Sequence, residues 1–279
     1  MIELGKYQTL EVIKKTDFGF YLSKPGSDNN QRVLLPIKEA GEDTKLNDKI
    51  NVFIYKDSED REIATTSSVP LTLGGLATLK VKEVTNIGAF LDWGLMKDLL
   101  LPFKEQTYTV EEGDSVLVSL YVDKSNRLCA TMKVYDYLLA DSKYQKEDLV
   151  TGVIYDIIDA FGAFVAVDNL YSALIPNKEI FKPLNIGNTI TARVVEVRKD
   201  GKLTLSLREK SHLQIDSDAD LILNELKEAG GFLPYHDKSD AKEIQTKFMI
   251  SKNAFKRALG RLYKDGSITI LEDGISLKK

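Results

Sequence analysis

Apolar and polar residues alternate along the first three quarters of the chain, and the period of this alternation changes near residue 210. Segments such as TLKVKEV at 78–84 place an apolar residue at nearly every second position. A period of two is typical of a β-strand that buries one face, and glycine, asparagine and aspartate separate the alternating runs. The pattern predicts short antiparallel strands over residues 1–210 and a different architecture beyond them.

The alternating region contains one unit three times, each with about five short strands. The same turn-forming residues recur in every copy. They are Gly19, Gly88 and Gly162; Pro36, Pro102 and Pro176; and the turns Asn47-Asp48, Gly113-Asp114 and Gly187-Asn188. The glycines are 69 and 74 residues apart and the prolines 66 and 74. Because this period is too long for the common solenoid repeats, we expect three tandem antiparallel barrels.

Beyond residue 210 the apolar residues follow a helical period. Phe255, Ala258, Leu259 and Leu262 stand at i, i+3, i+4 and i+7, which is the spacing of one helix face. The final run SITILEDGISL contains an Asp-Gly pair and predicts a β-hairpin. Three helices and a hairpin indicate a winged helix. Capping residues predict the helix starts at Asp218 or Asp220, at Ser239-Asp240 and at Ser251.

The sequence thus predicts a mainly β fold class with four domains. Three small five-stranded antiparallel barrels are followed by a small α+β winged helix. The links near 67–73 and 138–146 are short, so we expect little freedom there, and the polar segment 210–218 is expected to be the main hinge. The predicted domain boundaries are 1–68, 69–138, 144–210 and 215–279.

The residues of the repeated unit resemble the S1 subgroup of OB-fold domains. That subgroup has the successive motifs G-x-V, G-A-F-V, G-L-x-H/P, G-D/N and R/K-L-x-L-S. The histidine often found in the third motif is proline in all three copies. The third copy matches best, with Gly152-Val153, Gly162-Ala163-Phe164-Val165, Ala173-Leu174-Ile175-Pro176, Gly187-Asn188 and Lys202-Leu203-Thr204-Leu205-Ser206.

The resemblance implies which residues bind single-stranded RNA. In S1 domains the aromatic residue before the glycine and the one two places after it lie on the RNA-binding face, where each can stack a base. A basic residue before the last strand holds phosphate, and an aspartate usually stands four residues earlier, where the third copy has Arg198. The alternative is that the aromatic residues only close the core. The implied aromatic positions are Phe161 and Phe164, Ile87 and Phe90, and Phe18 and Tyr21, and the basic ones are Lys202, Arg127 and Arg61.

Composition narrows the function classes. The hydrophobic share of 43% and the charged share of 29% are ordinary for a globular protein, and no apolar run reaches the length of a membrane helix. The N-terminus lacks a basic region followed by an apolar stretch, so we expect a cytoplasmic protein that does not bind membranes. Cys129 is the only cysteine, and the sequence has two histidines. This composition predicts a buried structural thiol and neither a metal nor a cofactor.

Catalysis is not indicated. The four predicted domains use nearly all 279 residues, and the sequence shows no P-loop, nucleophile elbow or metal-like carboxylate cluster. A ribonuclease is the enzyme alternative, because S1 domains often accompany ribonucleases, but no segment remains for a catalytic domain. We therefore predict that the protein is not an enzyme.

Charge is distributed unevenly along the chain. Residues 1–149 carry 19 Lys and Arg against 24 Asp and Glu, whereas residues 150–279 carry 19 against 18. The third helix of the winged helix presents a basic face that suits phosphates or a DNA groove. The alternatives are a solvated helix face and a surface for protein partners, since an acidic tip at Glu272-Asp273 would repel a nucleic-acid backbone. The basic residues of this helix are Lys252, Lys256, Arg257, Arg261 and Lys264.

Three S1-like units followed by a winged helix resemble the conserved virulence factor B family of bacterial RNA-binding regulators, over essentially the whole chain. The resemblance implies post-transcriptional control of gene expression with single-stranded RNA as the partner. The alternative is a DNA-binding or protein-binding regulator that acts through the winged helix, with the barrels as spacers. Oligomeric state and RNA targets do not follow from the sequence.

Overall fold

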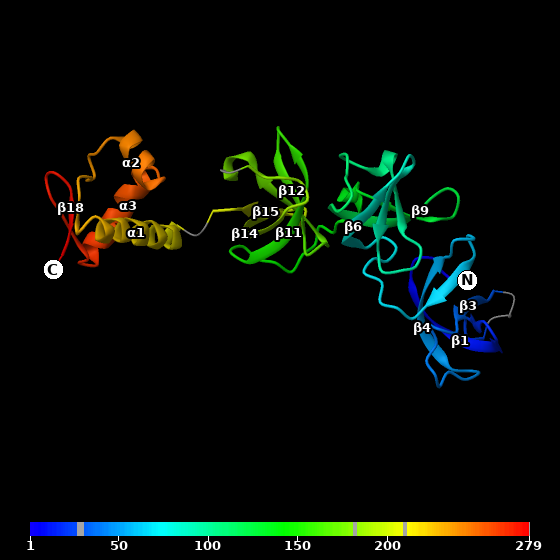
Figure 1. Ribbon diagram of the computed structural model, residues 1–279. Coiled ribbons are helices and arrows are strands. Elements are labelled where there is room, and N and C mark those ends of the chain that lie inside the picture. The colour runs from blue at the N-terminus through cyan, green and yellow to red at the C-terminus, as the bar shows by residue number, and fades with distance from the viewer. Residues whose placement is uncertain (27–30, 181–182, 209–210, 279) are drawn as a thin grey trace. The chain divides into compact units, whose positions relative to one another are not determined.

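The protein forms two compact units, Met1–Leu207 and Arg208–Lys279. The computed structural model describes residues 1–26, 31–180, 183–208 and 211–278, without the side chains of 211–217. The predicted domain ends at 210 and 279 fall outside these residues. Among the described residues, the regular elements of the first unit are strands and short 3-10 turns, and the second unit contains three helices and a small sheet (Figure 1). The mainly β fold class predicted from the sequence is confirmed.

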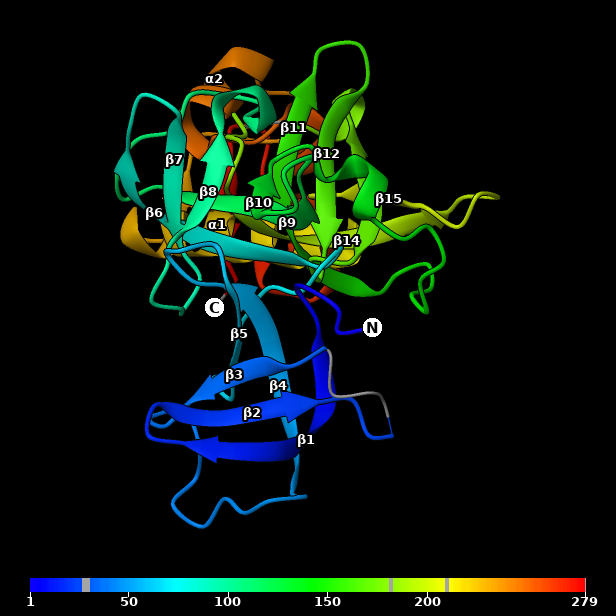
Figure 2. The same ribbon diagram turned by 90° about the vertical axis from the view of Figure 1, so that its right-hand side faces the viewer.

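The first and third copies fold into closed five-stranded barrels with equivalent strand orders, β1-β2-β3-β5-β4 and β11-β12-β13-β15-β14. Figure 2 shows β2 between β1 and β3. One parallel pair closes each barrel, through Leu34 and Ile63 in the first and Ala173 and Leu203 in the third. The strands are β1 (Tyr7–Thr16), β2 (Gly19–Ser23), β3 (Val33–Pro36), β4 (Lys49–Lys56), β5 (Glu62–Thr65), β11 (Leu149–Ile158), β12 (Gly162–Val167), β13 (Tyr171–Pro176), β14 (Thr189–Val197) and β15 (Leu203–Ser206).

The second copy is a nearly closed barrel. Its five strands form one sheet in the order β10-β9-β6-β7-β8, which ends at β10 and β8. Short 3-10 turns follow its third and fifth strands, η1 (Phe103–Glu105) and η2 (Val134–Tyr137). The strands are β6 (Leu76–Val84), β7 (Gly88–Asp92), β8 (Leu99–Pro102), β9 (Ser115–Val122) and β10 (Leu128–Thr131).

A shared apolar cluster joins the first barrel to the second. Phe53 and Tyr55 of β4 are buried in one cluster with Trp93, and the rings of Phe53 and Trp93 meet edge to face at 6.0 Å. Burying a side chain such as Phe53 completely contributes about 1.5–3 kcal/mol. The Lys97 ammonium donates a 2.8 Å hydrogen bond to the carbonyl oxygen of Asp57. Outward-facing aromatic residues of the first barrel are therefore buried in this junction.

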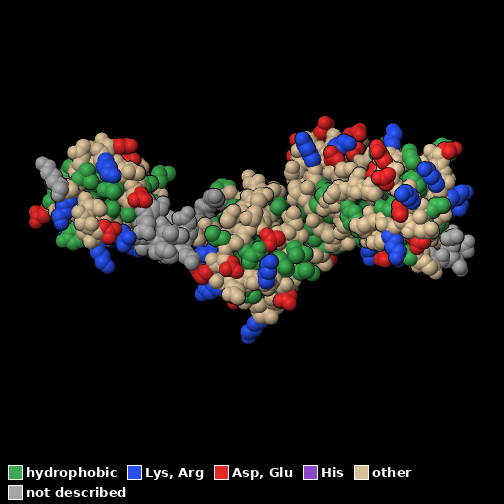
Figure 3. All heavy atoms as spheres, turned by 90° about the horizontal axis from the view of Figure 1, so that it is seen from below, with side chains coloured by type: hydrophobic (Ala, Val, Ile, Leu, Met, Phe, Trp, Pro, Cys, Tyr) green, Lys and Arg blue, Asp and Glu red, His purple; other side chains and the backbone are tan. Residues whose placement is uncertain are grey.

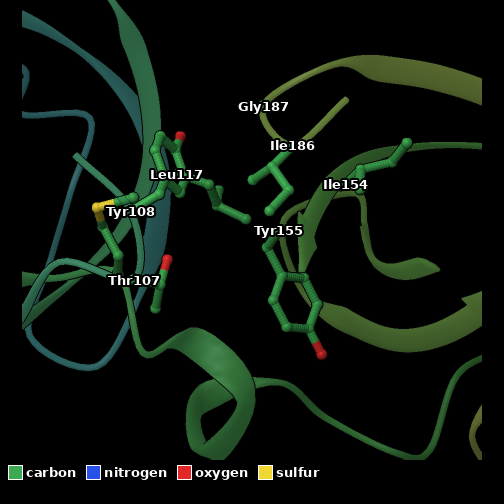
Figure 4. A pocket seen from close by; sticks show the side chains of 8 residues that line it. Thr107, Tyr108, Leu117, Ile154, Tyr155, Ile186 and Gly187 are labelled. Carbon is green, nitrogen blue, oxygen red and sulfur yellow. The ribbon is translucent and has the colours of Figure 1, made fainter. Parts of the chain in front are cut away.

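A second cluster joins the second barrel to the third. Leu117 of β9 and Val134 of η2 are buried with Val153, Tyr155 and Ala166 of the third barrel. Figure 4 shows the side chain of Leu117 directed toward Ile186 and Tyr155 at the edge of a small pocket in this junction. The two apolar junctions explain why Met1–Leu207 is one compact unit, as the short links lead us to expect.

The second unit has the helices and hairpin of a winged helix. The caps predicted for the second and third helices are confirmed, since the Asp240 carboxylate accepts from Lys242 N and the Ser251 hydroxyl from Ala254 N. The sheet has the order β16-β18-β17. In the described residues no helix is long and apolar enough to cross a membrane. The elements are α1 (Ser211–Glu228), β16 (Phe232–Leu233), α2 (Ala241–Phe248), α3 (Lys252–Lys264), β17 (Ile268–Ile270) and β18 (Ile275–Leu277).

The start of the first helix corrects the sequence prediction. A cap at Asp218 or Asp220 was expected, but both residues lie inside α1, which begins at Ser211. The same helix occupies most of the segment 210–218 that was expected to be a hinge, and the boundary between the units falls earlier, at Leu207 and Arg208. The prediction relied on the apolar periodicity that begins at Leu221 and on the nearest capping residue before it, so it placed the start of the helix too late.

Candidate nucleic-acid interface

Three equivalent glycines set the geometry of the outward face of each barrel. Gly19, Gly88 and Gly162 have positive φ values of 148°, 147° and 123°. A β-carbon on Gly162 would lie 2.1 Å from the carbonyl oxygen of Ile175, and the corresponding distances at Gly19 and Gly88 are 2.1 and 2.3 Å. Only glycine fits such a close backbone approach. The residues just before and two places after each glycine are thereby fixed at the start of the second strand.

A hydrogen bond repeated in all three barrels fastens the turn after the third strand to the fifth strand. The Thr65 hydroxyl donates to the Glu39 carboxylate at 2.8 Å, Thr131 donates to Glu105 at 2.9 Å, and Ser206 donates to Glu179 at 2.6 Å. These pairs were not predicted from the sequence. The signal was present, because a Lys-Glu pair recurs in every copy, with its glutamate 26 or 27 residues before a hydroxyl residue.

The third barrel presents the aromatic pair from which its binding was predicted. Val165 and Val167 are fully buried in the core, so Phe164 points outward and is half-buried. Phe161 is 59% exposed. The two phenylalanine rings meet at 6.5 Å between centroids and 75°, and Phe164 meets Tyr155 at 6.2 Å. Phe161 is therefore free to stack a base, whereas Phe164 both supports it and packs against the junction.

The predicted basic residues of the third barrel lie in different surroundings. The Lys202 ammonium donates a 2.8 Å hydrogen bond to the hydroxyl of Tyr135 and lies 4.9 Å from the centre of that ring. The exposed Arg198 guanidinium is 3.4 Å from the Asp200 carboxylate. Arg198 thus occupies the place of the usual aspartate, and Asp200 accepts from Lys202 N to hold the turn instead.

The first barrel carries the most exposed aromatic residue of the predicted set. Phe18 is 80% exposed, and the Arg32 guanidinium lies 4.8 Å from the centre of the half-buried Tyr21 ring. Arg61 pairs with Asp57 at 2.8 Å and with Glu59 at 2.7 Å. Partial burial opposes ionisation of Asp57, but hydrogen bonds from the Arg61 side chain and from backbone N–H groups outweigh it and lower its pKa. Phosphate would have to compete with these carboxylates for Arg61.

The second barrel has the weakest face. Ile87 is 54% exposed and stands where the third barrel has Phe161, and Phe90 is half-buried. Arg127 forms an ion pair with Asp60 of the first barrel, and Asp60 also accepts from Lys97 at 3.2 Å. Hydrogen bonds from these two cations hold the pKa of Asp60 below its usual value, and the hydrogen bond from Lys97 has the larger effect. Arg127 therefore serves the junction between barrels.

The single thiol is structural, as the sequence predicts. Cys129 is buried in β10. Burial raises the pKa of this thiol to about 11, and the nearby Asp123 carboxylate acts in the same direction. The thiol is therefore protonated at neutral pH and a poor nucleophile. Among the described residues, no group of three or more His, Cys, Asp or Glu side chains is placed to hold a metal ion.

The predicted basic face of the winged helix lies on α3. The apolar face of α3 is buried, and four of the five predicted basic residues are exposed. Arg261 Nε lies 3.1 Å from the Asp265 carboxylate, and the half-buried Lys252 donates to the carbonyl oxygen of Lys238 at 3.3 Å. Basic and acidic side chains are interspersed on the face of the protein in Figure 3. The exposed members are Lys256, Arg257, Arg261 and Lys264.

Models of known families match nearly the whole chain. Residues 4–67 and 73–133 match the S1 domain, and residues 138–209 match the second domain of the virulence regulatory factor CvfB. Residues 220–277 match the CvfB-like winged helix domain. The first two barrels are therefore S1 nucleic-acid-binding domains, and the second unit contains a winged helix.

Known relatives match this chain over nearly its whole length. The chain is 34% identical over 276 residues to the uncharacterized protein YitL of Bacillus subtilis, which covers 95% of this chain and 90% of that protein. It is 28% identical to conserved virulence factor B of Staphylococcus haemolyticus, with coverage of 99% and 95%. A Streptococcus pneumoniae crystal structure, described as a multidomain protein with nucleic acid binding domains, is 26% identical, covers 99% of this chain and 98% of that one, and has a TM-score of 0.51.

Proposed function

Because the chain belongs to the conserved virulence factor B family and carries S1 nucleic-acid-binding domains, we propose that it is a non-catalytic, cytoplasmic RNA-binding protein. It holds single-stranded RNA on the outward face of the third barrel and acts on gene expression after transcription. The observation that carries this proposal is the exposed ring of Phe161 stacked edge to face on Phe164.

The chemistry of this face suits single strands better than duplexes. Every base has a π-face, so an exposed aromatic ring binds unpaired bases with little dependence on sequence, at about 1–3 kcal/mol per base. In a duplex the bases are paired and their faces are covered by stacking. Lys202 and Arg198 lie at the start of β15 and in the turn before it, where they can hold backbone phosphates.

The distribution of charge also favours RNA binding by the third barrel and the second unit. The third barrel and the second unit carry slightly more basic than acidic residues, whereas the first two barrels are acidic. Binding RNA releases counterions from phosphates, so basic side chains on the binding face raise affinity in proportion to the contacts they make. We expect the first barrel to add contacts through Phe18 and Tyr21, and the second barrel to serve as a spacer.

A second function rests on the winged helix. The exposed basic residues of α3 favour duplex DNA or a protein as the ligand of the second unit. In that case the loss of Lys256 and Arg257 abolishes duplex binding and leaves single-strand binding largely unchanged. The acidic wing tip at Glu272-Asp273 favours a protein over DNA.

The test is the binding of fluorescent single-stranded RNA to the full chain at two salt concentrations. The Phe161→Ala, Phe164→Ala double variant is compared with the matched Ile87→Ala, Phe90→Ala variant of the second barrel. We expect the first pair to lose at least about fivefold in affinity, since one stacked base is worth about 1–3 kcal/mol, and the second pair to change little.

Circular dichroism of both double variants controls for folding. Equal affinities for wild type and the folded Phe161→Ala, Phe164→Ala variant would assign both phenylalanines to structure. A loss confined to the second-barrel variant would move the binding face to Ile87 and Phe90.

A further inference from the structure

The segment that joins the second barrel to the third is fixed on the third barrel. Its Val134 is buried in the cluster that contains Tyr155. Leu139 N donates to the carbonyl oxygen of Leu170 at 2.8 Å, and Ser172 N donates to that of Leu139 at 2.8 Å. The segment therefore runs beside β13, and whatever side chains it exposes belong to the surface of the third barrel.

Tyr135 is exposed although the segment around it is packed. Its ring is 50% exposed, while its neighbour Val134 is fully buried and supplies the packing of the junction. In the first junction the residue that corresponds to Tyr135 is Val69, four residues after Thr65, and it is buried. A tyrosine here therefore offers a ring to solvent without being needed to close the junction.

The backbone next to Tyr135 packs against the aromatic row of the third barrel. Phe161, Phe164 and Tyr155 follow one another at 6.5 and 6.2 Å. Val134, the residue before Tyr135, is buried in one cluster with Tyr155, and Phe164 packs against that cluster. Phe161 and Tyr135 are exposed aromatic residues beside residues of this cluster, and Lys202 lies beside Tyr135.

Given the proposed function, on which this step rests, we infer that Tyr135 is a base-stacking residue for single-stranded RNA that the inter-barrel link supplies to the third barrel. An RNA strand bound at Phe161 continues across the barrel to Tyr135, and Lys202 holds the phosphate there. The binding site is therefore longer than the barrel alone provides.

Three variants of the full chain test this inference with oligouridylates of increasing length. Tyr135→Ala removes the ring, and Tyr135→Phe keeps the ring but removes the hydroxyl that accepts from Lys202. Phe103→Ala is the matched control, because Phe103 is an aromatic residue of the second barrel with 48% exposure. We expect Tyr135→Ala to lose about fivefold or more in affinity for long oligomers, and the other two to stay within about twofold of wild type.

The length dependence separates stacking from a structural role. In the wild type, affinity rises with RNA length until the strand reaches Tyr135, and in Tyr135→Ala it reaches its plateau at a shorter length. Tyr135→Trp adds a direct readout, because Trp93 is the only other tryptophan and is buried. The fluorescence of the tryptophan introduced by Tyr135→Trp is expected to be quenched by long oligomers and to stay unchanged with oligomers too short to reach it.

The outcomes distinguish the two proposals. If Phe161→Ala, Phe164→Ala loses affinity while Tyr135→Ala keeps both the affinity and the length dependence of wild type, the inference about Tyr135 is wrong and the proposed function stands. If neither variant changes RNA binding, both are wrong. A loss in Tyr135→Ala at every length, including the shortest, would also contradict a stacking site at the end of the strand.

Discussion

The second and third barrels have the same framework but different outward faces. In both, the second strand begins at a glycine that leaves no room for a β-carbon beside a backbone carbonyl oxygen. In both, a hydroxyl of the fifth strand donates a hydrogen bond to a glutamate. On the face itself, the third barrel has Phe161 where the second has Ile87. The basic residue before the last strand contacts Tyr135 in the third barrel and is paired with Asp60 in the second.

This difference separates the residues that fold such a barrel from the residues that we propose bind RNA. The glycine, the glutamate and the core residues are needed in every copy, because each copy forms its own five-stranded sheet around its own core. The face is needed only where a ligand lies, and elsewhere it is available for junctions. Phe53 and Tyr55 of the first barrel illustrate this, since they are outward-facing aromatic residues buried against Trp93.

The largest expected effect breaks the shared framework. Gly162→Ala places a β-carbon 2.1 Å from a carbonyl oxygen, and Gly88→Ala places one at 2.3 Å. We expect each variant to lower the free energy of unfolding by about 3 kcal/mol. Urea unfolding measures this. Gly260→Ala in α3 is the control, because no atom lies within 4 Å of the new carbon, and it is expected to be neutral or slightly stabilising. Unchanged stability of either barrel variant would refute the close approach.

The second effect removes the repeated hydrogen bond. Thr131→Val and Ser206→Ala each take away a hydroxyl that donates to a partly buried glutamate. We expect each to cost about 1–3 kcal/mol of stability, measured by the same unfolding experiment. Thr78→Val on the exposed side of β6 is the matched control. A similar cost at Thr78 would show that the hydroxyl-glutamate pair contributes nothing special.

The third effect converts one face toward the other. Ile87→Phe restores an exposed aromatic ring next to Phe90, and we expect it to raise affinity for single-stranded RNA by about fivefold, near 1 kcal/mol. Leu149→Phe adds a comparably exposed ring at the start of β11, at the opposite end of that strand from Gly162, and serves as control. An equal gain in both variants would indicate nonspecific stacking.

The fourth effect is electrostatic. Lys202→Gln in the third barrel is expected to reduce the slope of log affinity against log salt by about 0.7, since it removes one phosphate contact to a single strand. Lys124→Gln in the second barrel, at an exposed turn, is expected to leave the slope unchanged. Binding titrations at several salt concentrations measure both. The comparison between barrels fails if the two slopes change equally.

The smallest effect concerns Cys129, which the second barrel has where the third has Thr204. Its pKa is raised by burial to about 11, above the value near 8.5 of a free thiol. The thiolate is therefore scarce in the folded protein below about pH 11, and we expect a thiol reagent at pH 8 to react far more slowly with folded than with urea-unfolded protein. Equal rates would show that the thiol is accessible and ionised.

Much of this organisation follows from the sequence because it is local and repeated. The spacing of Gly19, Gly88 and Gly162 predicts three barrels, and the alternation around Phe164 leaves two possible faces for its ring. The sequence does not decide between them, because either set of side chains can form the core. Burial of Val165 and Val167 decides it.

Features formed by distant residues were harder to predict. The bond between Glu105 and Thr131 spans 26 residues, and the pairing of Arg127 with Asp60 spans two barrels. Tyr135 lies near the end of the predicted second domain, and the docking of the following Leu139 beside β13 brings this segment to the surface that we propose binds RNA. Such contacts depend on how distant strands and neighbouring barrels pack, which no single strand pattern encodes.

The most direct test of the account is to map where RNA touches the full chain. Single-stranded RNA containing 4-thiouridine is photo-crosslinked to the protein, and the crosslinked residues are identified by mass spectrometry. We expect crosslinks at Phe161 and Phe164 of the third barrel and few at Ile87 and Phe90. Crosslinks concentrated on the second barrel, or confined to α3, would contradict the claim that the third barrel is the principal RNA-binding face.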